Sequence, residues 1–576
     1  MALPVNVFYE NYLLNPLNPE EKKDLADNRE ALIGKNCFEN ELAFGTGGVR
    51  EIVEHGTNRL NRFNMARLNL ALTATLRESI PNSPLIIIAY DSRLTSTDFA
   101  WQSYHILKSR GLRVKIFQRP APTPLLSFAV ALLEADAGIV LTASHNPPEY
   151  NGFKVYGNDG AQIVSPMDAV IEKNYRDISY AKMLNFPDLY NFSPPELSDV
   201  IENEISDAYL SALKSENFVT AEPKNISILY SPLHGTGGWI FEKIFNALNF
   251  TNFKILTEQA LPDGDFPTVK SPNPEEPAAF KLLLDNGRIY NSEILLASDP
   301  DADRIGAAIR SGDSYKLLTG NQICVLLLDF LIRKKMPGGG FREPYVCKTI
   351  VTSDLVQKIA VDNNIRVVEV LTGFKNIAAA IKNDPENYIF GGEESFGYLP
   401  VNWVRDKDSI SSAVALCEMA STENLQDTLE KLYLKYGYYH DHAFSIKISG
   451  GEKQRKDIID KLNNPREFIS RLKFSRQLVD CMDLRDAKQL PGGDHNQKLK
   501  KQLGKAEVVK YFFDPDATIT IRPSGTEPKI KIYIGLKSAR TFDKDSLPGI
   551  QKELADEALF LQREIAKLLE SQEKLC

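Results

Sequence analysis

The stretch GIVLTASHNPPEYNGFKVY, residues 138–156, decides how the rest of the chain is interpreted. An apolar run at 139–141 indicates a buried strand, and small polar residues follow it. Two prolines and an Asn-Gly pair then indicate a tight loop, after which an extended pattern resumes. We therefore expect Ser144 just past the end of a strand, with His145 beside it and Lys154 returning nearby.

Two interpretations of Ser144 are open at this point. Open α/β sheets bind their ligands outside the carboxyl ends of strands, so Ser144 suits a nucleophile or a phosphoryl carrier. The other interpretation is an ordinary surface serine on a hairpin loop, because a serine beside a histidine is frequent by chance. The remainder of the chain has to decide between them.

Composition limits the class of protein. A chain of 576 residues is too long for one hydrophobic core and suggests roughly four domains. The 43% hydrophobic and 25% charged residues favour a folded globular protein, and a net charge of -8 gives no support to nucleic-acid binding. The six cysteines contain no CxxC pair, which favours a reduced, cytoplasmic protein.

A membrane protein is not expected either. The N-terminal residues lack the charged region and the long apolar region of a signal peptide. The most apolar window, 323–332, is too short to cross a bilayer and contains Asp329.

The first part of the chain alternates between strand and helix patterns. Residues 1–40 read as helices, and FGTGGVR at 44–50 lets the backbone approach a ligand that Arg50 could clamp. Its spacing is neither a Walker A loop nor GxGxxG, so nucleotide binding is not indicated. Further strands at 85–90 and 114–117 argue for a wound α/β domain ending near residue 205.

A cluster of carboxylates follows the strand expected at 294–297. Asp299, Asp301 and Asp303 alternate on one short loop, where they repel one another unless a cation lies among them. Hard oxygen ligands of this kind suit Mg²⁺. An EF-hand calcium loop is excluded, because Arg304 stands where that loop needs glycine. A solvated acidic turn is the remaining alternative.

Two more polar loops follow strands in the third unit. LTGFK at 371–375 follows the strand 367–370, and GGEESFG at 391–397 follows the strand 388–390. Buried glutamates on a glycine-rich loop need hydrogen-bond donors, which sugar hydroxyls can supply. The charged run RDKD at 405–408 could equally be a solvated helix start.

The C-terminal part presents a loop between two alternating strands. Thr518–Ile521 and Ile530–Ile534 alternate as half-buried strands do, with RPSGTEPK at 522–529 between them. A guanidinium, two hydroxyls and a flexible glycine can wrap a phosphate with charge-assisted hydrogen bonds. A terminal amphipathic helix is expected from residue 546 onward.

Four of these loops resemble one family. TASHNP with NGFK, DPDADR, GGEESFG and RPSGTEPK resemble, in order, the serine, metal, sugar and phosphate loops of the α-D-phosphohexomutase superfamily. The resemblance covers roughly residues 40–540 and implies an α/β fold of three similar domains with mixed sheets. A smaller C-terminal α+β domain completes a central cleft. The expected domains are 1–205, 206–315, 316–440 and 441–576.

The resemblance also implies roles for individual residues. The expected catalytic residues are Ser144, which carries the phosphoryl group, His145, Lys154 and Lys407. The expected Mg²⁺ ligands are Ser144, Asp299, Asp301 and Asp303. The expected substrate-binding residues are Arg50, Arg304, Thr372, Gly373, Lys375, Glu393, Ser395, Arg522, Ser524, Gly525 and Thr526.

The implied activity is that of a phosphoglucomutase, because Glu-Ser-Phe-Gly resembles the glucose-specific branch. Such an enzyme interconverts glucose 1-phosphate and glucose 6-phosphate through a phosphoserine and glucose 1,6-bisphosphate. Phosphomannomutase, phosphopentomutase and glucose-1,6-bisphosphate synthase activities are the alternatives, followed by a silent sugar-phosphate-binding protein. The expected partners are small sugar phosphates, without nucleic acid or membrane, for a monomer or weak dimer.

Overall fold

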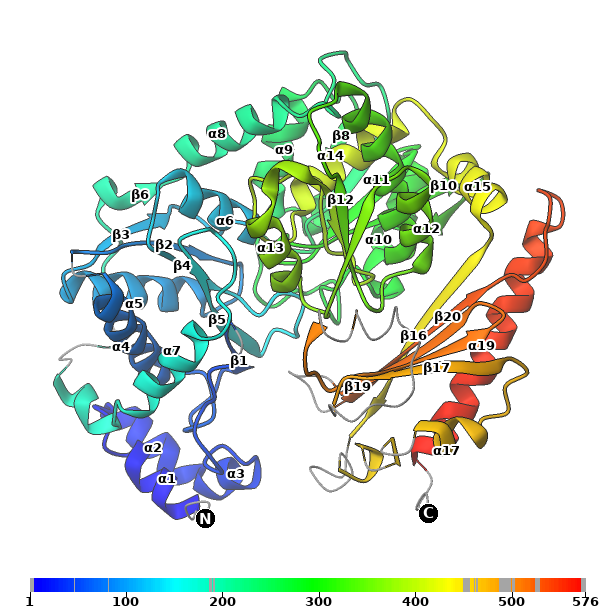
Figure 1. Ribbon diagram of the computed structural model, residues 1–576. Helices are drawn as coiled ribbons and strands as arrows, with labels where there is room; N and C mark the ends of the chain where they lie inside the picture. The colour runs from blue at the N-terminus through cyan, green and yellow to red at the C-terminus, as the bar shows by residue number, and fades with distance from the viewer. Residues whose placement is uncertain are drawn as a thin grey trace.

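In the described part of the chain, four β-sheets follow one another. In the computed structural model, the described residues are 5–45, 47–80, 82–185, 189, 192–448, 456–459, 461–462, 465–485, 499, 503–523 and 529–570. Figure 1 shows the sheets in an arc from blue to red, with the first and last sheets at its two ends. The predicted fold class, three mixed-sheet α/β domains and a C-terminal α+β domain, is confirmed. The predicted domain boundaries stay predictions.

The first sheet has the strand order β1-β5-β4-β2-β3-β6. Its strands are β1 (Gly48–Ile52), β2 (Leu85–Tyr90), β3 (Arg113–Phe117), β4 (Ala137–Leu141), β5 (Tyr150–Gly157) and β6 (Val200–Ile201). The helices before and around it are α1 (Val5–Tyr12), α2 (Pro19–Asp27), α3 (Arg29–Gly34), α4 (Arg62–Ser79), α5 (Ser96–Ser109), α6 (Thr123–Leu132) and α7 (Met167–Arg176). Asn18 begins α2 with a capping box: the Asn18 side chain accepts from the backbone N–H of Glu21, and the Glu21 side chain accepts from the backbone N–H of Asn18.

The second sheet has the order β11-β10-β9-β7-β8. Its strands are β7 (Ile228–Ser231), β8 (Phe253–Ile255), β9 (Ile294–Ser298), β10 (Ile305–Ser311) and β11 (Ser314–Leu317). Its helices are α8 (Asn203–Lys214), α9 (Gly237–Ala247) and α10 (Lys281–Ile289).

The third sheet has the order β13-β12-β14-β15. Its strands are β12 (Tyr345–Thr349), β13 (Arg366–Val370), β14 (Tyr388–Gly392) and β15 (Tyr398–Leu399). Its helices are α11 (Gly320–Lys335), α12 (Asp354–Asp362), α13 (Phe374–Asn383), α14 (Ser409–Ala420) and α15 (Leu425–Tyr436).

The fourth sheet is antiparallel throughout, in the order β16-β20-β19-β18-β17. Its strands are β16 (Tyr439–Lys447), β17 (Gln477–Asp483), β18 (Val509–Asp514), β19 (Ala517–Pro523) and β20 (Lys529–Lys537). The helices α17 (Pro465–Ser470) and α19 (Leu547–Glu570) accompany it, and α19 runs along the sheet in Figure 1. Gly437, at a φ of 95°, turns the chain from α15 into this sheet.

The three α/β sheets place their polar loops at the same point of the topology. Within each sheet, a buried strand that pairs in parallel with one neighbour is followed by a strand that pairs antiparallel to it. These turns lie between β4 and β5, between β9 and β10, and between β14 and β15. They carry Ser144, the three aspartates and Glu393 respectively. The strand ends therefore determine which loops can meet.

Aromatic side chains from separate domains pack together near the middle of the chain. Phe128, Tyr209 and Trp403 form three edge-to-face pairs with ring centroids 5.0 to 5.6 Å apart. The Tyr209 hydroxyl donates to the buried carboxylate of Asp408 at 2.6 Å. Asp408 also caps α14, but Asp406 and Asp408 are buried, so the RDKD run is a helix start that is not solvated. This packing holds the first three domains in one arrangement.

Candidate active site

Ser144 lies on the β4–β5 loop and is buried, with 2% of its surface exposed. Its φ of 52° is a left-handed conformation that a serine seldom adopts. Its Oγ donates to Asp299 Oδ2 at 2.8 Å and lies 3.1 Å from His145 Nδ1. The interpretation of Ser144 as an ordinary surface serine is therefore wrong.

The Arg93 side chain holds the backbone of this loop. Its two Nη atoms donate, at 2.5 to 2.8 Å, to the carbonyl oxygens of Ser144, Asn146, Pro147 and Tyr150. Arg93 in turn pairs with the buried Asp91, whose Oδ2 accepts from the Thr142 hydroxyl at 2.6 Å. The sequence reasoning missed both residues, and the available signal was a charged pair directly after the buried strand β2.

The three aspartates form a compact buried group. They are at most 1% exposed, so a solvated acidic turn is wrong. One carboxylate oxygen from each lies within 4.8 Å of the others. Asp301 Oδ1 and Asp303 Oδ1 are buried and accept no hydrogen bond from the described residues. Burial and the two neighbouring carboxylates raise the pKa of Asp299 well above its ordinary value. Buried oxygens without donors fit a divalent cation.

Two lysines face the aspartates from different domains. Lys154 Nζ lies 2.8 Å from Asp301 Oδ2, and Lys407 Nζ lies 2.9 Å from Asp303 Oδ2. Burial alone would lower the pKa of Lys407, but Asp303 and Asp406 raise it above its ordinary value. Lys407 is therefore a cation that holds its proton and pairs with the aspartates.

His145 differs from the lysines in charge. Burial lowers its pKa well below the ordinary value, and the cations Arg304 and Arg50 act in the same direction. The imidazole is therefore neutral at pH 7 and can accept a proton. Arg50, from β1, donates to Asn146 Oδ1 at 3.1 Å and so lies beside the serine loop.

The sugar loop is tied to both neighbouring loops. Glu393 Oε1 accepts from the backbone N–H of Gly373 at 2.8 Å. The Ser395 carbonyl accepts from Arg304 Nη1 at 3.1 Å. Arg304 thereby joins the aspartate loop to the sugar loop.

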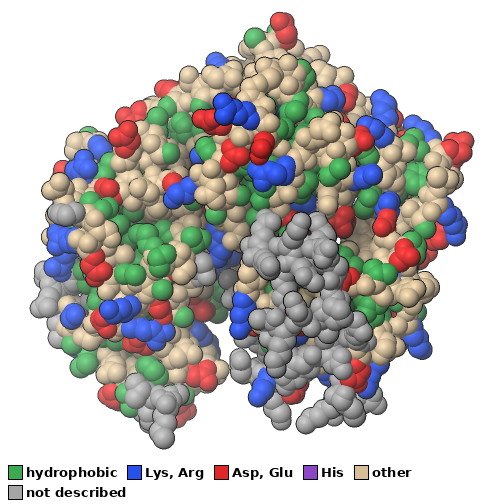
Figure 2. All heavy atoms as spheres, viewed as in Figure 1, with side chains coloured by type: hydrophobic (Ala, Val, Ile, Leu, Met, Phe, Trp, Pro, Cys, Tyr) green, Lys and Arg blue, Asp and Glu red, His purple; other side chains and the backbone are tan. Residues whose placement is uncertain are grey.

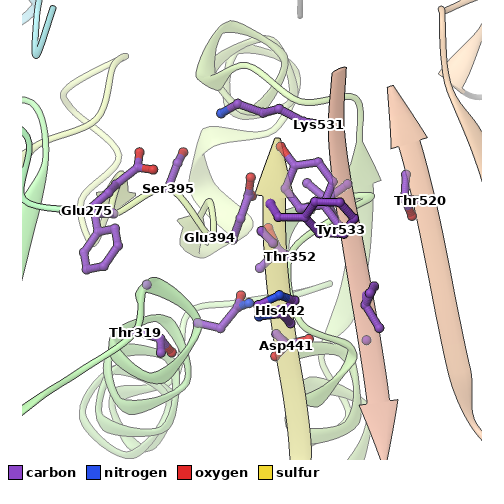
Figure 3. Close-up of a pocket in the computed structure, with 18 of the residues that line it drawn as sticks. Glu275, Thr319, Thr352, Glu394, Ser395, Asp441, His442, Thr520, Lys531 and Tyr533 are labelled. Carbon is purple, nitrogen blue, oxygen red and sulfur yellow. The ribbon is translucent and has the colours of Figure 1, made fainter. Parts of the chain in front are cut away.

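The phosphate loop is described only at its two ends. Arg522 donates to the Thr372 hydroxyl, which brings the C-terminal sheet against the 371–375 loop. Lys375 follows Thr372, and burial lowers its pKa. Ser524, Gly525 and Thr526 lie outside the described residues. The sequence reasoning also missed Lys531 on β20, which lines the cavity that adjoins the sugar loop (Figure 3).

A cavity of about 390 Å³ adjoins the sugar loop and lies against the C-terminal sheet. Figure 3 shows Glu275 and Ser395 on one wall, Glu394 between, and Lys531 with Tyr533 across from them. Burial and the neighbouring Glu393 raise the pKa of Glu394 to about 7. The cavity therefore presents carboxyl, ammonium and hydroxyl groups among apolar side chains such as Phe280 and Phe396.

On the face of the molecule that Figure 2 shows, the described side chains form no patch of a single charge. On the face in Figure 2, Lys and Arg side chains are interspersed with Asp and Glu. Within the described part of the chain, no helix has the length and apolar character needed to cross a membrane.

Comparison with known proteins decides the family. Models of phosphoglucomutase/phosphomannomutase α/β/α domains I, II and III match residues 41–182, 207–312 and 319–436. The chain belongs to this family. A phosphoglucomutase of Staphylococcus aureus strain MSSA476 is 35% identical over 520 residues, covering 88% of this chain and 91% of the relative. A Staphylococcus epidermidis phosphoglucomutase is 33% identical, covering 92% and 96%.

Solved structures of family members share the fold. A phosphoglucomutase/phosphomannomutase family protein from Burkholderia thailandensis superposes with a TM-score of 0.64 at 17% identity, covering 92% of this chain and 98% of that one. An Aspergillus fumigatus N-acetylphosphoglucosamine mutase, solved with GlcNAc-6P and magnesium, gives 0.52 at 14% identity, covering 96% and 99%. The family resemblance expected from the sequence is confirmed.

Proposed function

We propose that this chain is a phosphoglucomutase that interconverts glucose 1-phosphate and glucose 6-phosphate. The observation that carries the proposal is the hydrogen bond from Ser144 Oγ to Asp299, one of three buried aspartates that two lysines face. A nucleophilic oxygen beside a cation site is the arrangement that phosphoryl transfer requires. The staphylococcal relatives named phosphoglucomutase support glucose as the sugar.

Mg²⁺ would be held by the three aspartates and by Ser144 in its phosphorylated form. Bound there, Mg²⁺ would neutralise phosphoryl oxygens. The donor set fits, since Asp301 Oδ1 and Asp303 Oδ1 are buried and accept no hydrogen bond from the described residues.

The other residues would bind the substrate and move protons. Arg522, with the 524–526 loop, would hold the phosphate that is not reacting, and Glu393 with Ser395 would hold sugar hydroxyls. Arg304, Arg50 and Lys375 would add positive charge for phosphate, and Thr372 with Gly373 would position these groups. His145 would accept the proton of the attacking hydroxyl, while Lys154 and Lys407 would remain cations.

The reaction would proceed in two transfers. The 6-hydroxyl of glucose 1-phosphate attacks the phosphoserine and forms glucose 1,6-bisphosphate, while the freed Ser144 Oγ takes the proton back from His145, whose Nδ1 lies 3.1 Å away. The bisphosphate turns end for end, and Ser144 takes back the 1-phosphate, leaving glucose 6-phosphate. Glucose 1,6-bisphosphate would therefore also activate unphosphorylated enzyme. We further propose a cytoplasmic monomer or weak dimer, in keeping with the buried free cysteines among the described residues.

A coupled assay of glucose 6-phosphate formation tests the function. It would contain glucose 1-phosphate, Mg²⁺ and a trace of glucose 1,6-bisphosphate, with mannose 1-phosphate and ribose 1-phosphate in parallel. We expect rapid turnover of the glucose ester and a loss of at least about 10³-fold in Ser144→Ala. Ser127→Ala, at another buried serine of the same domain, is the control. Preference for another sugar would overturn the proposal that the substrate is a glucose phosphate. If the enzyme turns over no ester, a catalytically silent sugar-phosphate-binding protein would be favoured.

A further inference from the structure

Glu275 forms an ion pair with the guanidinium group of Arg304. Arg304 is one of the residues proposed above to bind the phosphate of the substrate. Arg304 Nη1 donates to Glu275 Oε1, and the two side chains are 16% and 29% exposed. A half-buried ion pair of this kind is screened less by solvent than a surface pair. A phosphate that approaches Arg304 therefore meets a neutral pair and not a free cation.

The backbone around Glu275 keeps its carboxylate in this place. The Glu275 N–H donates to Asn273 Oδ1 at 3.0 Å, and Asn273 is 8% exposed. Pro274 packs against the start of β10, where a Cβ added to Gly306 would lie 3.0 Å from Pro274 Cβ. The segment that carries Glu275 is thus braced against the strand that follows Arg304.

The same guanidinium also touches the sugar loop. Arg304 Nη1 donates to the Ser395 carbonyl, and Figure 3 shows Glu275 and Ser395 on the same wall of the cavity. The carboxylate of Glu275 consequently lies beside the position where a bound sugar phosphate would contact Arg304. Its negative charge opposes that of the phosphate.

In the proposed reaction, repulsion between Glu275 and phosphate would help the bisphosphate to leave its first position. Glucose 1,6-bisphosphate has to release each phosphate from its first position before it can turn. A cation that held the phosphate too tightly would lower KM while slowing the turn, because binding that is strong in a ground state does not accelerate the reaction.

We propose that Glu275 is a positioning residue that weakens the hold of Arg304 on phosphate, so that the bisphosphate can turn. This inference rests on the proposed mutase function. The proline-rich segment around Glu275 would thereby influence both the rate at which the bisphosphate reorients and the affinity for substrate.

The test compares Glu275→Gln with Glu276→Gln. Both substitutions remove one negative charge, but Glu276 is exposed. For Glu275→Gln we expect KM for glucose 1-phosphate and the Kd of glucose 1,6-bisphosphate to fall about fivefold to tenfold. We expect kcat to fall by a similar factor, while a single transfer from phosphoserine to glucose 1-phosphate stays within about twofold. Glu276→Gln should match the wild type.

A second readout follows the bisphosphate itself. Enzyme that carries a labelled phosphoserine is mixed with excess glucose 1-phosphate. The fractions of the label found in glucose 6-phosphate and in free glucose 1,6-bisphosphate are then measured. Glu275→Gln should release a smaller fraction of the label as free glucose 1,6-bisphosphate than the wild type does. Raising the salt concentration should reduce its KM difference from the wild type, as expected for a charge effect.

Several results would overturn the inference. An unchanged or higher KM in Glu275→Gln, or the same shift in Glu276→Gln, would mean that Glu275 does not oppose phosphate. A lower melting temperature together with a higher KM would indicate a purely structural anchor. If the wild type turns over no sugar phosphate, the proposed function fails, but calorimetric titration of glucose 1-phosphate still tests whether Glu275→Gln binds more tightly.

Discussion

Ser144 Oγ and Asp299 Oδ2 lie 2.8 Å apart, although 155 residues separate them in the chain. The two residues belong to equivalent turns of two different sheets, at β4–β5 and at β9–β10. The hydrogen bond is possible because helices of the first three domains pack on one another, α6 on α8 and α9 on α14. The site is therefore a property of how the domains pack.

Removal of divalent metal should abolish activity and reduce stability. The aspartate group places three buried carboxylates together, and a bound cation would relieve their repulsion. We expect EDTA to lower the initial rate at least about 10²-fold and to lower the melting temperature, with Mg²⁺ restoring both. At about one hundred times its Kd, Mg²⁺ should add about 2.7 kcal/mol of stability. A melting temperature unaffected by EDTA and Mg²⁺ would argue against the metal site.

Arg93→Lys should damage catalysis without weakening substrate binding. A lysine can keep the charge beside Asp91, but it cannot donate to four carbonyl oxygens of the serine loop. We expect kcat to fall about 10²-fold with KM within about twofold, because the Ser144 Oγ loses its position. Arg113→Lys, on the exposed end of β3 in the same sheet, is the matched control. A larger effect on KM than on kcat would contradict this role.

Asp441→Asn should increase stability at neutral pH but not in acid. Burial raises the pKa of Asp441 to about 6, above its ordinary value of 3.8. Between these pH values the native state binds more protons than the unfolded state, so wild-type stability falls as pH rises. A pKa raised from 3.8 to about 6 corresponds to about 3 kcal/mol, so we expect the variant to be more stable by up to about 3 kcal/mol at pH 8 and equal to wild type near pH 3.5. Melting curves across this range, with the exposed Asp313→Asn as control, provide the measurement.

Tyr209→Phe should destabilise the contact between domains. The Tyr209 hydroxyl donates to Asp408 at 2.6 Å, and both side chains are fully buried. Loss of this donor leaves a buried carboxylate with fewer hydrogen bonds, which costs about 1–3 kcal/mol. Urea unfolding should show the loss, whereas Tyr290→Phe, at a half-exposed ring, should stay within about 0.5 kcal/mol. Equal stability of both variants would mean that water replaces the hydroxyl.

Much of the local structure was predictable from the chain. The strand predicted at 85–90 is β2, and the alternation at 518–521 lies within β19. The strand expected at 294–297 is β9, which ends one residue later, at Ser298. Apolar runs of this kind indicate a strand that is buried on both faces. They predict where a strand lies more accurately than where it begins and ends.

The supporting residues were less predictable than the reacting ones. Asp91 and Arg93 act on a loop that lies about fifty residues further along the chain, as the Arg93–Ser144 contact shows. Glu275 and Lys531 approach the site from a proline-rich segment and from the last domain. No local pattern marks such residues, because their partners are set by the packing of separate sheets.

The sequence by itself determined the chemistry of each loop: a serine after a strand, three alternating aspartates, paired glutamates and a loop suited to phosphate. These depend on residue type and near spacing, which strand and turn geometry convert directly into local structure. Only the tertiary structure decided that Lys154 faces Asp301, that Lys407 faces Asp303, and that Glu275 neutralises Arg304. Charges acquire partners and altered pKa values when burial removes water and distant segments meet, and that happens only in the folded chain.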